Sequence, residues 1–168
     1  MQSIDDVYAG ATRRIALVEA FAQQYGLERY AAADHIGYRC SSSAEYETLR
    51  KLIEQYSVFV YQSIISKRRI SIIKLATPFP SILGEVAYLE LADQKPDGSQ
   101  VSGFDHLEIY PIIDTFNDLV SHIEAQGAEG EPSTTPHHPT HNFPITKDFK
   151  LKVESGKLID KIKKEEMT

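Results

Sequence analysis

The chain has 168 residues, of which 42% are hydrophobic and 25% charged, as in an ordinary folded domain. Its net charge of -6 argues against a nucleic-acid-binding surface, which needs an excess of Lys and Arg, and no apolar run approaches the roughly 18 residues of a membrane span. The first residues lack the basic and apolar regions of a signal peptide, and Cys40 is the only cysteine. We therefore expect a cytoplasmic protein without nucleic-acid or membrane partners.

The N-terminal region, residues 1–30, is predicted to be a helical extension. Val7, Ile15 and Val18 recur near helical spacing between residues 3 and 29, and Gly26 is a typical C-terminal stop. We expect this helix to pack outside the rest of the fold.

Residues 31–100 show the order strand, helix, strand, strand, strand. Serines 41–43 can cap a helix, and the polar turn 66–68 separates two apolar stretches of strand composition. Residues 77–80 (Thr-Pro-Phe-Pro) are predicted to interrupt the chain before the last strand. The predicted strands are 33–40, 57–65, 69–75 and 82–91.

Residues 101–155 repeat this order less clearly. A strand at 104–110 precedes a helix at 114–125, and a weak strand with a loop is predicted within 130–141. Two strands follow at 142–146 and 149–154, and residues 156–168 are predicted to be a short helix or tail. The sequence thus predicts one compact α+β domain with two βαβββ modules.

The first strand of each module carries the same three-residue pattern, Asp-His-apolar. His35 and His106 are 71 residues apart (106 minus 35), each preceded by an aspartate. Strict alternation predicts that Phe104, His106 and Glu108 share one face of the second strand, opposite Leu107. Two copies of a histidine strand suggest a duplicated module with a metal ion between the halves.

The last strand of each module carries a glutamate opposite its apolar face. If the two modules curl around one another, His35, Glu90, His106 and Glu154 converge on one concave face. Two imidazoles and two carboxylates suit one divalent ion of Zn, Ni, Fe, Co or Mn. The alternative for Glu154 is an ordinary exposed strand face, shared with Lys150 and Lys152.

Several charged residues are predicted to lie on or near the same face. Arg39 and Lys152 suit an anionic substrate, because a guanidinium binds a carboxylate in bidentate fashion and lysine supplies a point charge. Either can instead pair with Glu108. Lys74 completes the predicted substrate-binding set of Arg39, Lys74, Glu108 and Lys152.

Two other features have structural interpretations. Asp34 and Asp105 fall on the apolar face by alternation, so we interpret them as caps. His137, His138 and His141 are separated by Pro and Thr, which favours a loop that borders the concave face.

Together these segments resemble the vicinal oxygen chelate superfamily, which includes glyoxalase I, extradiol dioxygenases and methylmalonyl-CoA epimerase, and more closely its YecM-type branch. The resemblance implies two βαβββ modules whose cupped sheets hold a divalent metal. At the position of Glu154, the YecM-type pattern carries histidine. At this position the chain is more similar to the glyoxalases and epimerases, which have a set of two histidines and two glutamates. The segments that carry the resemblance are 33–40, 74–75, 89–91, 105–109 and 151–153.

The resemblance implies three possible functions. The first is a metal-dependent isomerase, lyase or epimerase that acts through an enediolate-like intermediate on a small anionic substrate, with Glu90 or Glu154 as proton carrier. The second is a binding protein that keeps the metal and catalyses nothing. The third is a non-haem Fe²⁺ dioxygenase. Both modules lie in one chain, so a monomer suffices, and a homodimer is equally compatible.

Overall fold

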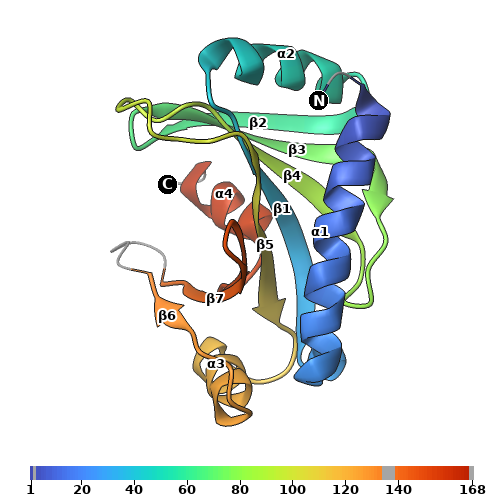
Figure 1. Cartoon of the computed structure of the whole chain (residues 1–168), viewed down its shortest axis with the longest axis vertical. Coiled ribbons are helices and arrows are strands. Elements are labelled where there is room, and N and C mark those ends of the chain that lie inside the picture. Colours follow the sequence, from blue (N-terminus) through green and yellow to red (C-terminus); the bar gives the residue numbers. More distant parts are fainter. Residues whose placement is uncertain (2, 134–138, 167–168) are drawn as a thin grey trace.

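Eight strands form a single curved sheet in the computed structural model, which describes residues 1, 3–133 and 139–166 (Figure 1). The strand order is β2-β3-β4-β1-β5-β8-β7-β6. The strands are β1 (Ala31–Arg39), β2 (Ser57–Ile65), β3 (Arg68–Phe79), β4 (Val86–Ala92), β5 (Gly103–Pro111), β6 (Glu131–Pro132), β7 (His141–Thr146) and β8 (Phe149–Val153).

Each half of the sheet is one βαβββ module, with its helix after its first strand. These helices are α2 (Ser43–Glu54) and α3 (Phe116–Ala125). Within each module the first strand is parallel to the fourth, β1 to β4 and β5 to β8. The predicted α+β fold of two βαβββ modules is confirmed.

The modules meet where β1 runs antiparallel to β5. These two strands are the histidine strands of the sequence, so the duplicated Asp-His pairs lie next to one another at the centre of the sheet. The seam between the modules is therefore also the place where the two histidines predicted as metal ligands lie close together.

The main hydrophobic core lies on the outer face of the sheet, under α1 (Ile4–Gln24). A capping box between Ser3 and Asp6 begins this helix, whose buried Val7, Ile15 and Val18 pack with the apolar residues of the central strands and of α2 and α3. None of the helices in the described ranges is long and apolar enough to cross a lipid bilayer.

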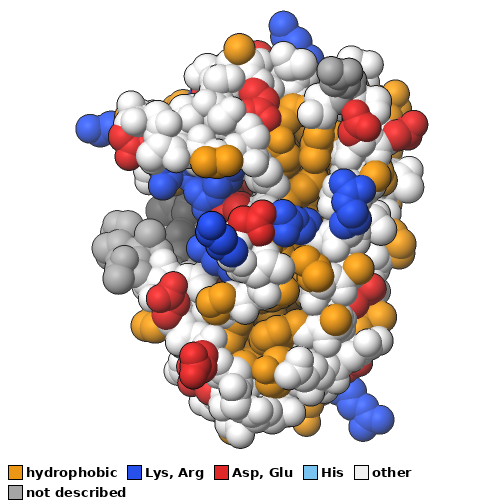
Figure 2. Space-filling view, viewed as in Figure 1, with side chains coloured by type: hydrophobic (Ala, Val, Ile, Leu, Met, Phe, Trp, Pro, Cys, Tyr) orange, Lys and Arg blue, Asp and Glu red, His pale blue; other side chains and the backbone are white. Residues whose placement is uncertain are grey.

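The inner face of the sheet carries a second, smaller cluster. The predicted C-terminal helix or tail is the helix α4 (Leu158–Glu166), and its buried Ile162 packs with Ile70, Ile72 and Ala92. In the space-filling view this side is hollowed at the left, with Lys and Arg side chains beside the hollow (Figure 2). Thus α4 covers part of the concave face.

Several element boundaries differ from those predicted, and the largest differences are at the end of α1, at the end of β3 and at the start of β4, which begins at Val86 and not at residue 82. The first helix ends at Gln24, because Gly26 adopts a left-handed φ of +61° and a short 3₁₀ turn (Leu27–Arg29) follows. The interruption predicted at residues 77–80 starts only after Phe79, the last residue of β3. Phe79 pairs with Val86 of β4 after an irregularity in the register.

Candidate metal centre

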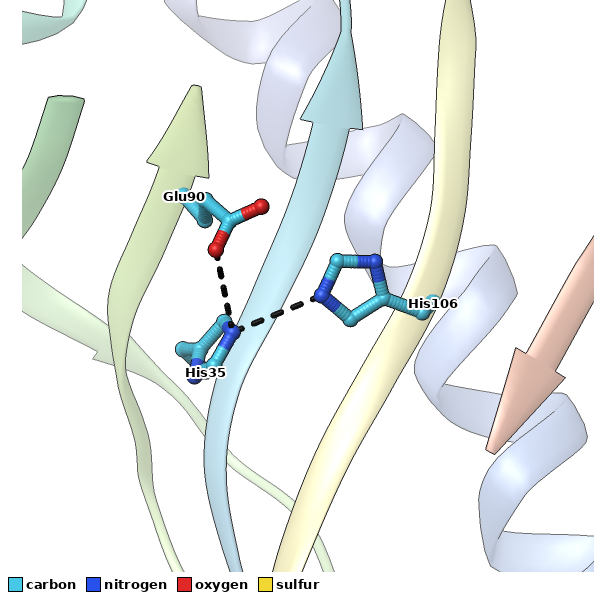
Figure 3. A group of neighbouring side chains, drawn as sticks. All are labelled: His35, Glu90 and His106. Atoms are coloured by element: carbon cyan, nitrogen blue, oxygen red, sulfur yellow. Dashed lines mark hydrogen bonds and ion pairs between the residues drawn. The ribbon is translucent and has the colours of Figure 1, made fainter. Parts of the chain in front are cut away.

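The central strands bring two histidines and a glutamate together. Gly37 of β1 pairs with Glu90 on β4 and with His106 on β5. His35 precedes Gly37 by two residues and therefore points to the same face. The side chains of His35, Glu90 and His106 thus all lie on the concave face. The Nε2 atoms of His35 and His106 are 3.4 Å apart, and Nε2 of His35 lies 3.7 Å from Oε2 of Glu90 (Figure 3). The three potential ligand atoms lie within 4.8 Å of one another. We call this group the His-Glu cluster.

Each histidine is held by the aspartate that precedes it. Oδ2 of Asp34 is 2.9 Å from Nδ1 of His35, and Oδ1 of Asp105 is 2.8 Å from Nδ1 of His106. In a neutral imidazole, Nδ1 then carries the hydrogen that it donates to the carboxylate, and Nε2 keeps its lone pair. This carboxylate support of the second ring nitrogen is typical of histidines that bind metals.

A β-bulge in each histidine strand makes this contact possible. The pairing of β1 with β5 skips Asp34 between Ala33 and His35, and it skips Asp105 between Phe104 and His106. A bulge inserts one unpaired residue and turns its side chain away from strict alternation. The prediction that Asp34 and Asp105 lie on the apolar face was therefore wrong, because both carboxylates reach the histidine rings. The capping interpretation holds for Asp34, whose Oδ2 also accepts a hydrogen bond from the backbone N–H of Leu158 at the start of the C-terminal helix α4.

The same bulge corrects the prediction for Phe104. Strict alternation predicted that Phe104 shares the face of His106, but Phe104 is buried in the main core beneath α1, edge-on to Tyr38. The alternation of side chains does not indicate an inserted residue, so the one-residue irregularity at the Asp-His pair of each strand was missed.

Gly37 leaves room for the ring of His106. A β-carbon at Gly37 would collide with three atoms of that imidazole, Cε1, Nδ1 and Nε2. A glycine at this position therefore allows the ring to lie across β1 and to face His35.

The chemistry of the His-Glu cluster fits a cation. Two imidazole lone pairs and a carboxylate oxygen face one another at 3.4 and 3.7 Å, with no hydrogen between them in the neutral rings. Such a group of acceptors is stable only with a positive charge among them. Two borderline nitrogen donors and one hard oxygen suit Zn²⁺, Ni²⁺, Fe²⁺, Co²⁺ or Mn²⁺.

The pKa shifts show the same preference for positive charge. Burial alone would lower the pKa of His35, but Glu108, Asp34 and Glu90 outweigh burial and raise it to about 9. Burial alone would raise the pKa of Glu90, but His106 and His35 together lower it. The cluster thus stabilises a cation between anions.

The fourth predicted ligand, Glu154, lies apart from the His-Glu cluster. It is buried and pairs with Lys161 of α4. Burial and the nearby Glu108 raise the pKa of Glu154, although Lys161 and Lys152 act in the opposite direction. No set of candidate ligands within the described residues includes Glu154, so its role as a ligand stays a prediction.

Glu108 lies closer to the cluster than Glu154 does. Its Oε2 is 3.8 Å from Nε2 of His35 and 3.1 Å from Nζ of Lys152. Its side chain is 4% exposed, whereas that of Glu90 is 23% exposed. Both glutamates line a cavity on the concave face, and Glu90 is the more exposed to solvent of the two.

His35 and Glu90 of the cluster line this cavity of about 780 Å³ on the concave face. Of the predicted substrate-binding residues, Arg39, Glu108 and Lys152 line this cavity. Lys74 does not: it is exposed and lies 6.0 Å from the ring centre of Tyr88, so we leave it out of the proposed site. Arg39 pairs with Asp105.

The described part of the predicted histidine loop borders this cavity, because Thr140 is one of the lining residues. His137 and His138 lie outside the described residues. His141 begins β7, and its Nε2 lies 3.0 Å from Glu124 of α3. His141 therefore faces α3, not the His-Glu cluster.

Comparison with known proteins identifies the family. The family model described as YecM protein matches residues 6–163, which is nearly the whole chain. The chain belongs to the YecM family. No curated protein matches this YecM chain significantly.

One solved structure shows the same fold. The chain is similar to Protein EC4020, with a TM-score of 0.77 and 20% identity over 96% of this chain and 92% of the other. A methylmalonyl-CoA epimerase gives a TM-score of 0.46 and 10% identity, over 74% of this chain and 96% of that chain. A mutant 4-hydroxymandelate synthase from Streptomyces coelicolor gives 0.37 and 13%, over 76% and 49%. At 20% identity, the likeness between this YecM chain and Protein EC4020 extends to the fold alone.

Proposed function

We propose that this protein is a divalent-metal-dependent enzyme of the vicinal oxygen chelate type, which performs isomerase, lyase or epimerase chemistry on a small anionic oxygenated molecule. One observation carries the proposal: two histidines, each supported by an aspartate, and a glutamate meet beside a cavity of about 780 Å³, which His35 and Glu90 line. Cavities of this size accommodate a small-molecule ligand.

His35, His106 and Glu90 are the residues that would hold the ion. A bound divalent ion would supply Lewis-acid polarisation of a substrate oxygen. Arg39 and Lys152 add positive charge to the wall of the cavity, which favours an anionic substrate. Asp34 and Asp105 fix the orientation of the two rings.

Glu154 is our candidate for the proton carrier, with Glu90 as the alternative. Glu154 lines the cavity, and its raised pKa brings the carboxyl closer to the pH range in which a general acid or base works. Lys161 of α4 stabilises its ionised form. The carboxylate can therefore accept and return a proton without leaving the wall of the cavity.

A second candidate function is a non-haem Fe²⁺ dioxygenase. The pairing of Glu154 with Lys161 leaves two histidines and one glutamate, which is the ligand set typical of non-haem iron oxygenases. A metal-binding protein without catalysis has the same ligands, but it needs no open coordination position.

Elemental analysis of untagged protein tests the proposal. We expect about one equivalent of a divalent transition metal in the wild type, lost in His106→Ala and in Glu90→Gln. Glu85→Gln is the matched control, because Glu85 is exposed and outside the cavity. A wild type that takes up none of the five ions would refute the metal function.

Water relaxation separates the enzymatic proposals from simple binding. Protein loaded with Mn²⁺ should enhance the relaxation of water protons if a coordination position is open to solvent. Loss of that enhancement on addition of an α-hydroxy acid would support an enzyme that chelates substrate oxygens. A bound ion without exchangeable water would favour the binding protein. Oxygen uptake by the Fe²⁺ form in the presence of candidate substrates would favour the dioxygenase.

A further inference from the structure

Four cationic side chains line the cavity, and three of them have acidic partners. Arg39 pairs with Asp105, Lys152 with Glu108, and Lys161 with Glu154. The fourth is Lys150 of β8. Within the described residues no hydrogen bond or ion pair joins its ammonium group to an acid.

The surroundings of Lys150 compensate its positive charge only in part. Its side chain is partly buried, and burial together with the nearby Arg39 and Lys152 lowers its pKa, although Asp105 and Glu131 act in the opposite direction. A cation held near other cations gains stability when an anion approaches. The same wall therefore favours a negatively charged ligand group.

Asn142 of β7 supplies a second, independent sign of a ligand. Its side chain lines the cavity and is only 8% exposed, and its Oδ1 atom has no hydrogen-bond partner among the described residues. Buried polar atoms without a partner are rare in folded proteins. An asparagine amide offers donors and an acceptor, and rotation of the amide exchanges their places.

The register of the sheet places these residues at a distance from the His-Glu cluster. Lys150 pairs with His106 on the adjacent strand, and Asn142 pairs with Lys152, which in turn pairs with Glu108. Neighbouring strands lie about 4.8 Å apart, so the two side chains begin roughly 5 to 10 Å across the sheet from the histidine strand β5. Paired residues on neighbouring strands point to the same face, so both side chains share the cavity with the cluster.

We propose that Lys150 and Asn142 form a subsite for a second anionic group of the substrate, a carboxylate or a phosphate, several bonds away from the oxygens that reach the His-Glu cluster. This inference rests on the proposed function for the position of the first group. It narrows the substrate class to molecules with vicinal oxygens at one end and an oxyanion at the other.

A matched series of α-hydroxy acids tests the subsite. 2-Hydroxybutyrate has no second anion, 2-hydroxyglutarate has a distal carboxylate, and 3-phosphoglycerate has a distal phosphate. Calorimetric titration of metal-loaded wild type should give at least about tenfold tighter binding for one or both dianionic ligands, because charge-assisted hydrogen bonds are strong in a partly buried site. The preferred ligand identifies the class of oxyanion.

Substitution of the lysine provides the decisive comparison. Lys150→Met should abolish the preference for the dianionic ligands, whereas Lys147→Met should keep it. Lys147 is the matched control, since it is exposed in the nearby β7–β8 turn and outside the cavity. An unchanged preference in Lys150→Met, or no preference in the wild type, would overturn the subsite. Thermal unfolding confirms that both variants are folded.

A metal-free titration keeps this inference separate from the proposed function. Chelator-treated protein is titrated with inorganic phosphate, with Lys150→Met alongside. If the protein takes up no metal but its affinity for phosphate depends on Lys150, the metal function is refuted and the subsite is supported. Metal uptake together with a phosphate affinity that is independent of Lys150 would overturn the subsite alone.

Discussion

The imidazole ring of His106 occupies the space that a β-carbon on Gly37 would need. The two residues pair across the seam between the modules, so the backbone of β1 forms the floor on which the ring lies. The ring can face His35 only because this floor has no side chain.

Gly37→Ala should therefore disturb the metal centre more than the fold. The added methyl group forces the ring of His106 to move, and crowding of this kind costs about 1–3 kcal/mol of unfolding free energy. We expect metal affinity to fall about tenfold or more, as seen by titration with a competing chelator. The control is Gly156→Ala, where a β-carbon would meet nothing within 4 Å. Equal metal affinity in Gly37→Ala and wild type would contradict this role of the glycine.

Asp105→Asn should weaken metal binding without removing a ligand. The neutral amide supports the imidazole of His106 less well than the carboxylate does, and loss of such support typically costs about 10–100-fold in metal affinity. The measurement is the dissociation constant of Zn²⁺ or Ni²⁺ by chelator competition. Asp97→Asn, in an exposed turn, serves as control and should bind metal as the wild type does. If Asp105→Asn had the same metal dissociation constant as the wild type, the charge of Asp105 would have no role in the support of His106.

The stability of chelator-treated protein should depend on pH through His35. Its pKa is raised from 6.5 to about 9 in the folded state, so the protonated ring stabilises the fold fully below about pH 6.5, and this contribution is lost as the pH rises through 9. Denaturant unfolding at pH 6, 7.5 and 9 measures the decline, which His35→Gln should largely remove. Metal affinity should rise over the same range, because the ion and the proton compete for the same atom. A flat stability profile in the wild type would contradict the raised pKa.

Lys161→Met tests whether Glu154 can join the metal centre. The variant leaves a buried carboxylate near Glu108 without its partner, which should lower the unfolding free energy of metal-free protein by about 3 kcal/mol. If Glu154 is a ligand, added metal should restore much of this loss, and metal affinity should increase. Lys163→Met on the exposed side of α4 is the control. Unchanged metal affinity in Lys161→Met would assign Glu154 to the wall of the cavity instead.

The order of elements could be predicted because each module repeats the same pattern of apolar periodicity and turns. The strand β2 was predicted with the bounds that the structure shows, and both βαβββ modules were recognised. The second module was less clear because β6 has only two residues, Glu131 and Pro132, which leave almost no periodic signal.

The details of the site could not be predicted because they depend on contacts between distant segments. Strict alternation misplaced Phe104 and the two aspartates, since the sequence gives no direct sign of a bulge. The pairing of Glu154 with Lys161 depends on where α4 folds back, which no local pattern specifies. Glu108 was expected near the substrate, and the structure adds that it lies 3.8 Å from His35.

The two histidines lie on the two strands that join the modules, and this has a consequence for how the halves depend on each other. An ion held by His35 of one half and His106 of the other would act as a cross-link over the seam. Its binding free energy would then add to the cohesion of the whole chain, because a ligand that binds only the folded state stabilises it by mass action. Removal of the ion should destabilise both halves together, so the unfolding temperature of the chain would depend on how much metal is bound.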